Sequence, residues 1–165
     1  MMPLLIDSML VFVKKLLMIM LGLLLLVSCA CADAENPDTG RKILLSANGK
    51  TVTASMAGNP SADAFLALLQ EGSIAIEMHD YGCFEKTGPL EKDLDCSDEY
   101  FTAVPGDIIL YLGDSIAVYY DENSWEFTLL GHVDGATEES MRDFLGDGDP
   151  VVTFFLPDGE DNPEP

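Results

Sequence analysis

The sequence predicts a mainly β protein, folded as a closed or nearly closed barrel of about seven or eight short strands with two short helices. Short segments of alternating or continuous apolar residues recur along the chain. Two pairs of these segments flank the tight-turn sequences Asn48-Gly49 and Gly113-Asp114. Strands and helices do not alternate as in βαβ units, and closure into a barrel removes exposed strand edges.

The strands are expected mostly as hairpins. Residues 43–45 and 51–54 form the first hairpin, because Asn-Gly supplies the two positive φ angles of a type I′ turn. Residues 107–112 and 115–120 form the second, with a two-residue turn. Three further strands are expected at 73–78, 125–133 and 151–156.

Both helices are predicted from their end signals. Asn59 can cap the first helix, Pro60 suits its first position, and Gly72 ends it after an apolar stripe. The second helix covers residues 138–145 and is capped by Thr137. Its position between two strands places it against the barrel.

The N-terminus has the three-part layout of a secretory signal. Lys14 and Lys15 precede an apolar run from Leu16 to Val27, which is shorter than the roughly 20 residues that a membrane-spanning helix needs. Leu26-Val27-Ser28-Cys29 resembles a bacterial lipobox, in which the cysteine becomes the lipidated N-terminus. An uncleaved anchor is the alternative, and a start at Met9 would give a more ordinary signal.

The chain therefore divides into four parts. Residues 1–28 are expected to be a signal peptide with a lipobox, and residues 29–40 a flexible tether that begins at the lipidated Cys29. Residues 41–156 form the barrel domain, and residues 157–165 are a disordered acidic tail. The expected location is the cell membrane, through the lipid, facing outside the cytoplasm.

Charge excludes one class of partner. The 165 residues hold 29 Asp and Glu against 8 Lys and Arg, a formal net charge of −21, which repels nucleic acid. No calcium loop or other metal motif occurs, so neither a metal site nor a cofactor is expected. The charge itself is interpreted as a means of solubility rather than as a metal-recruiting surface.

Several short motifs follow one another along the predicted domain. They are the Asn48-Gly49 hairpin, the helix start Asn59-Pro60-Ser61-Ala62, Asp-Tyr-Gly-Cys-Phe-Glu-Lys-Thr-Gly-Pro-Leu at 80–90, Pro-Gly-Asp-Ile-Ile-Leu-Tyr at 105–111, and Asn-Ser-Trp at 123–125 ahead of Leu130-Gly131. Together they resemble the bacterial cyclophilin-like domain family over residues 43–155. The resemblance implies a closed eight-stranded β-barrel with two helices.

The same resemblance implies little about activity. The fold is that of peptidyl-prolyl isomerases, but those enzymes carry a Phe-His-Arg and a Gln-Gly-Gly-Asp segment in the proline pocket, and neither occurs here. The only arginines are Arg41, at the edge of the tether, and Arg142, on the second helix. The residues thus argue against transferring the isomerase activity with the fold.

A candidate binding site lies in and beside the segment 80–90. A loop that mixes aromatic rings with a carboxylate and an amine can form the mouth of a barrel pocket; the alternative is a structural corner with exposed charges. His79 is either part of a site with Glu77 or a solvated strand end, and His132 could supply a second imidazole. The candidate ligand-binding residues are His79, Tyr81, Phe84, Glu85, Lys86 and Trp125.

Cys83 and Cys96 are the only cysteines of the predicted domain. Export favours a disulfide between them, which would stabilise the domain by about 3 kcal/mol through loop entropy. Two unpaired thiols are the alternative, and a catalytic thiol is disfavoured because no cationic cluster or helix start adjoins either cysteine.

Three functions follow from these observations. The first is a lipid-tethered, non-enzymatic module that binds a small ligand or a peptide at a mouth formed by residues 80–90 and Trp125. The second is a weak or divergent peptidyl-prolyl isomerase acting on exported proteins. The third is a passive structural protein, whose barrel mouth would be filled by its own side chains.

Overall fold

The computed structural model describes residues 40–157. The predicted signal peptide, Cys29, nearly all of the tether and the acidic tail lie outside the described residues. Within the described part, no helix is long and apolar enough to cross a membrane.

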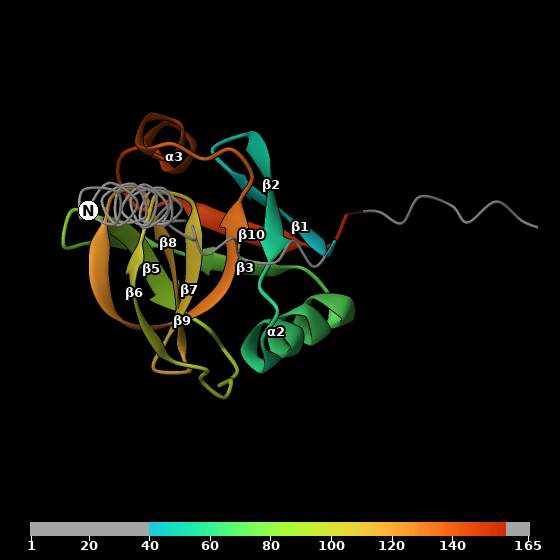
Figure 1. Ribbon diagram of the computed structural model, residues 1–165. Helices are drawn as coiled ribbons and strands as arrows, with labels where there is room; N and C mark the ends of the chain where they lie inside the picture. Colours follow the sequence, from blue (N-terminus) through green and yellow to red (C-terminus); the bar gives the residue numbers. More distant parts are fainter. Residues whose placement is uncertain (1–39, 158–165) are drawn as a thin grey trace, which may run out of the picture. The chain divides into compact units, whose positions relative to one another are not determined.

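The described chain is mainly β, with ten strands and two helices, which confirms the predicted fold class. The strands are β1 (Lys42–Ala47), β2 (Lys50–Met56), β3 (Ile74–Glu77), β4 (His79–Tyr81), β5 (Glu85–Pro89), β6 (Glu99–Ala103), β7 (Asp107–Tyr111), β8 (Ser115–Tyr119), β9 (Asn123–Val133) and β10 (Val151–Phe155). The helices are α2 (Pro60–Glu71) and α3 (Glu138–Leu145), and they lie at opposite ends of the curved sheet (Figure 1).

All strand pairs are antiparallel, and the sheet runs in the order β3-β10-β1-β2-β9-β7-β8-β5-β4, with β6 paired to β9. The prediction of a closed eight-stranded barrel is wrong, because this sheet has ten strands and no hydrogen-bonded pair joins its two ends within residues 40–157. The end strands β3 and β4 are instead consecutive in the chain, separated by Met78. The backbone itself therefore connects the two edges.

Strand β5 comes very close to β3 at this junction. A Cβ atom placed on Gly88 of β5 would lie 2.4 Å from the carbonyl oxygen of Glu77. Glycine is thus required there, because the two backbones meet without a hydrogen-bonded ladder.

Both predicted hairpins are present, but only one turn is as expected. Asn48 and Gly49 have φ angles of 52° and 73°, which confirms the type I′ turn. Between β7 and β8 the turn spans Leu112 to Asp114 rather than Gly113-Asp114, and Leu112 has a φ of 53°. A leucine in the left-handed region is uncommon, and sequence preference gave no sign of it.

The predicted helix caps are confirmed. The Asn59 side chain accepts a hydrogen bond of 2.8 Å from the Ala62 amide, and Thr137 forms a reciprocal capping box with Ser140. Each helix buries one face in the main core, where Phe65 of α2 meets Phe154 of β10 edge to face at 5.7 Å. The interior of the curved sheet is therefore filled by side chains of its own.

Candidate functional site

The strands β7 and β8 carry apolar side chains on both of their faces. Ile108 and Leu110 of β7, with Ile116 and Val118 of β8, belong to the main core. The alternate residues Ile109, Ala117 and Tyr119 form a second cluster together with Ala103 of β6 and Phe127 of β9. Because side chains alternate along a strand, this second cluster lies on the outer face of the curved sheet.

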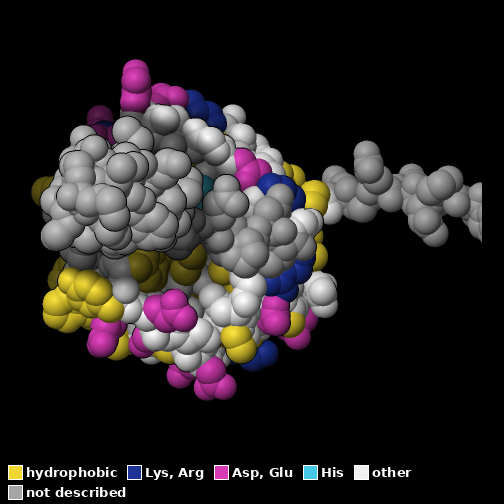
Figure 2. Space-filling model, viewed as in Figure 1, with side chains coloured by type: hydrophobic (Ala, Val, Ile, Leu, Met, Phe, Trp, Pro, Cys, Tyr) yellow, Lys and Arg dark blue, Asp and Glu magenta, His cyan; other side chains and the backbone are white. Residues whose placement is uncertain are grey.

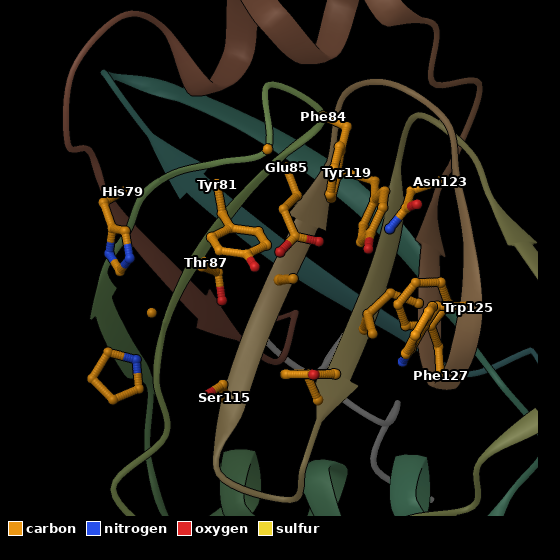
Figure 3. Close-up of a pocket in the computed structure, with 16 residues that line it drawn as sticks. His79, Tyr81, Phe84, Glu85, Thr87, Ser115, Tyr119, Asn123, Trp125 and Phe127 are labelled. Carbon is orange, nitrogen blue, oxygen red and sulfur yellow. The ribbon is translucent and has the colours of Figure 1, made fainter.

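A cleft of about 900 Å³ lies against that outer face. Its walls come from β4, β5, β7, β8 and the first half of β9 (Figure 3). The lining residues are His79, Tyr81, Gly82, Phe84, Glu85, Thr87, Gly88, Pro89, Ile109, Tyr111, Ser115, Ala117, Tyr119, Asn123, Trp125 and Phe127. The sequence predicts the pocket at the barrel mouth, whereas the structure has it on the outside of the sheet.

Strand β9 changes partner along its length and so forms the side wall. Its first half pairs with β6, from Asn123 opposite Ala103 to Phe127 opposite Glu99. Its second half pairs with β7, with a register irregularity next to Ile109. The first half is therefore free to leave the sheet and carry Asn123, Trp125 and Phe127 to one side of the cleft (Figure 3).

The cleft contains a connected set of aromatic rings. Phe84 stacks on Tyr119 with 5.7 Å between ring centroids, and it meets Tyr81 edge to face at 6.2 Å. Tyr119 in turn meets Phe127 edge to face at 5.7 Å. These contacts hold the rings in fixed orientations around the cavity.

Glu85 supplies the carboxylate of the cleft. It is 8% exposed and lies directly opposite Tyr119 in the ladder between β5 and β8. Figure 3 shows its carboxylate between the rings of Tyr81 and Tyr119. Burial raises the pKa of Glu85, and the Tyr119 hydroxyl, which favours the charged carboxylate, offsets part of that effect. The same burial and the adjacent carboxylate raise the pKa of Tyr119.

No lysine or arginine is among the residues that line this cleft. Most cations of the described chain are in ion pairs elsewhere, Arg41 with Asp63, Lys42 with Asp134, Lys50 with Asp143, Lys86 with Asp80, and Arg142 with Asp121 and Glu138. Within residues 40–157, no lysine or arginine therefore shares the cleft with the charge of Glu85.

The structure brings five of the six predicted ligand-binding residues together: His79, Tyr81, Phe84, Glu85 and Trp125 line the cleft. It does not bring Lys86 there. Lys86 is buried on the opposite face of β5, where its Nζ donates to Asp80 Oδ2 at 2.8 Å and to the Gly148 carbonyl at 2.7 Å. Lys86 thereby joins β5 to β4 and to the loop before β10.

Several lining residues were missed from the sequence, above all Tyr119, Phe127 and Asn123. A signal was present, since Ser-Ile-Ala-Val-Tyr-Tyr at 115–120 has apolar residues on both faces of the strand. A strand that is apolar on both faces must be shielded from water on both. On the outer face of β8, the side wall of the cleft provides part of this shielding.

The two histidines are not brought together. His79 lines the cleft, whereas His132 of β9 contacts Asp107 of β7 through Nδ1 and Oδ1 at 2.8 Å. This hydrogen bond raises the pKa of His132. Among residues 40–157 no group of three or more His, Cys, Asp and Glu side chains is arranged to hold a metal ion.

The expected disulfide between Cys83 and Cys96 is absent, and both cysteines are free and exposed. Cys83 lies two residues before β5, at the end where Glu85 pairs with Tyr119. Cys96 lies at the other end, since its Sγ is 3.8 Å from a Cβ atom built on Gly113. The five-residue strand between these ends spans about 13 Å, and a disulfide needs Cα atoms within about 7 Å.

Comparison with known protein families matches residues 45–154 to the model of the cyclophilin-like family. The match covers nearly all the described strands and includes every residue that lines the cleft. No curated protein matches the chain.

Proposed function

The chain belongs to the cyclophilin-like family, and from the aromatic cleft of its domain we propose that this member is a binding module, which holds a small organic molecule or a short peptide in that cleft. The cleft has the volume of a typical ligand site, which is about 300–1,000 Å³. Its apolar walls with a few polar groups also match the usual chemistry of such sites.

The observation that carries the proposal is the exposure of aromatic rings at the rim. Tyr81, Tyr111 and Trp125 are 62%, 42% and 58% exposed, and all three line the same cavity. Exposed aromatic rings around a concave apolar surface make favourable contacts with a ligand, whereas their exposure to water is unfavourable.

A neutral aromatic probe, naphthalene-2-methanol, tests this binding without invoking charge. Amide chemical shifts are followed during titration of the wild type, Trp125→Ala and Tyr100→Ala. Tyr100 is the matched control, because it is 74% exposed on β6 and does not line the cleft. The proposal expects shifts around the cleft and an affinity about fivefold or more weaker in Trp125→Ala alone. Equal affinities in all three proteins, or no binding, would overturn it.

Peptidyl-prolyl isomerisation is the second candidate, and family membership is what favours it. The two arginines of the described chain lie outside the cleft lining, one paired with Asp63 and the other stacked on Tyr120 at 4.3 Å. A proline-peptide isomerisation assay decides between the candidates. A rate that falls in Trp125→Ala and Tyr119→Phe would establish catalysis in this cleft, and a rate equal to the uncatalysed one would support binding alone.

We also propose that the domain is attached to the outer face of a membrane through a lipid on Cys29. The apolar run 16–27 followed by the lipobox-like Leu-Val-Ser-Cys supports this proposal. Metabolic labelling with a radioactive fatty acid tests it. Label in the wild type and none in Cys29→Ala is the expected result, and label that persists in Cys29→Ala would contradict it.

A further inference from the structure

We propose that the cleft selects ligands that carry an organic ammonium group, with Glu85 as the counter-ion and the surrounding rings as the walls of the ammonium site. This inference rests on the proposed binding function and adds the chemical class of the ligand.

Glu85 has an unusual position among the buried charges. Lys86 and Asp107 are also buried, but Lys86 is paired with Asp80, and Asp107 contacts His132 and accepts a hydrogen bond from the Val104 amide. In the described part of the chain, Glu85 is in no ion pair, and the group opposite it is the neutral phenol of Tyr119. A buried carboxylate without a cation is costly, and a bound cation would remove that cost.

Several aromatic side chains share the cavity with this carboxylate. Tyr81, Phe84, Tyr119, Trp125 and Phe127 all line the same cavity as Glu85. Aromatic faces attract cations through the ring quadrupole, by about 0.5–2 kcal/mol for each good contact. A carboxylate with several rings therefore suits an ammonium group on an apolar body better than it suits an anion or a metal ion.

The electrostatic field of the whole molecule also favours a cation. The net charge of −21 raises the local concentration of cations and repels anions. Figure 2 shows Asp and Glu side chains widely spread over the described part of one face, next to hydrophobic side chains. The long-range field and the local site thus both favour a positively charged ligand.

Affinity for a cation should follow the ionisation of Glu85. Burial raises the pKa of Glu85 above its ordinary value of 4.5, so ammonium binding should tighten as the pH rises through that raised value. The titratable groups that share the cleft with the carboxylate are Tyr119 on β8, Tyr111 on β7, and Tyr81 and His79 on β4, and Asp107 on β7 adds its charge near Tyr119.

Three ligands of one shape test the proposal: 2-naphthylmethylamine, naphthalene-2-methanol and 2-naphthoate. Each is titrated into the wild type, Glu85→Gln and Glu126→Gln at about pH 7. Glu126 is the matched control, since it is exposed between the lining residues Trp125 and Phe127 but does not line the cleft. Unfolding in urea checks that all three proteins are folded.

The wild type and Glu126→Gln are expected to bind the amine about tenfold or more tightly than the alcohol, with the carboxylate weakest. In Glu85→Gln the amine and the alcohol should bind about equally. Equal binding of amine and alcohol in the wild type would overturn the ammonium site while leaving the binding function standing. Binding of none of the three would instead overturn the binding function.

Two capped peptides, Gly-Phe-Lys-Phe-Gly and its norleucine counterpart, distinguish the source of the ammonium group. If the lysine peptide binds more tightly than both the norleucine peptide and 2-naphthylmethylamine, the ligand is a protein segment. If 2-naphthylmethylamine binds more tightly than the lysine peptide, the ligand is a small amine. A lysine peptide no tighter than its counterpart, together with no preference for the amine, contradicts the proposal for both sources.

Discussion

Glu85 and Tyr119 lie directly opposite each other on β5 and β8, and the phenol favours the charged form of a carboxylate that no lysine or arginine of the described chain neutralises. Directly opposed residues on one face of an antiparallel pair have Cβ atoms about 5 Å apart, so strand register alone fixes this contact. It places a desolvated negative charge within the aromatic cleft.

The pH dependence of stability should reveal this charge. Because the folded-state pKa of Glu85 is raised, the unfolded chain releases the proton first, and stability is lost as the pH rises from about 4.5 through the raised value. Glu85→Gln should remove that loss and be at least as stable as the wild type at about pH 7. Urea unfolding at several pH values measures it, with Glu126→Gln as control. A wild type whose stability relative to Glu85→Gln rises over this range would contradict the account.

Lys86 is expected to act on stability and not on binding. Lys86→Ala removes a buried stem and its contacts with Asp80 and Gly148, and should lower the free energy of unfolding by about 2–4 kcal/mol. Lys86→Met, which keeps the stem, should cost less. Lys92→Ala is the control, because Lys92 is exposed and should change stability by less than about 0.5 kcal/mol. A loss of probe affinity in folded Lys86→Met would place Lys86 in the site after all.

Gly82 should be required for the position of Phe84. A Cβ atom on Gly82 would lie 2.1 Å from the Phe84 ring, so Gly82→Ala should displace the ring and weaken probe binding by about fivefold. Gly49→Ala is the matched control, since Gly49 has a similar positive φ but open space around it. Both variants carry the backbone strain, and only Gly82→Ala carries the clash. Equal probe affinities in the two variants would show that the ring is not held as described.

The two thiols of the domain should be separately reactive. Alkylation of the freshly purified full chain without reductant, followed by peptide mass mapping, should find both Cys83 and Cys96 modified. Adding reductant should then leave the free energy of unfolding of the domain unchanged. A cross-linked peptide containing both cysteines would require β5 and its neighbours to be arranged differently.

Local signals predicted much of the fold. Asn48-Gly49 determined the first turn, Asn59 and Thr137 the helix caps, and period-two patterns most strands. The strands β4 and β6 were missed because their residues are mostly exposed, and β5 because Gly88 and Pro89 are poor strand formers. The prediction of a closed barrel was wrong because sheet closure depends on pairings between distant strands, which a single sequence does not display.

Only part of the candidate site could be predicted, because the rest of it depends on pairings between distant strands. The composition of the segment 80–90 predicts a loop with Tyr81, Phe84, Glu85 and Lys86 in one site. Residues 85–89 form β5 instead, and alternation along this strand sends Lys86 to the opposite face. Tyr119 and Phe127 enter the site only through the pairing of β5 with β8 and the departure of β9 toward β6. Such long-range register is a property of the folded chain.

Intermolecular nuclear Overhauser effects between 2-naphthylmethylamine and the protein test the central claim most directly. The account predicts contacts from the naphthyl protons to the rings of Tyr81, Tyr119 and Trp125, and from the methylene beside the nitrogen to the side chain of Glu85. Contacts confined to residues outside the cleft, or no contacts at saturating probe, would contradict it.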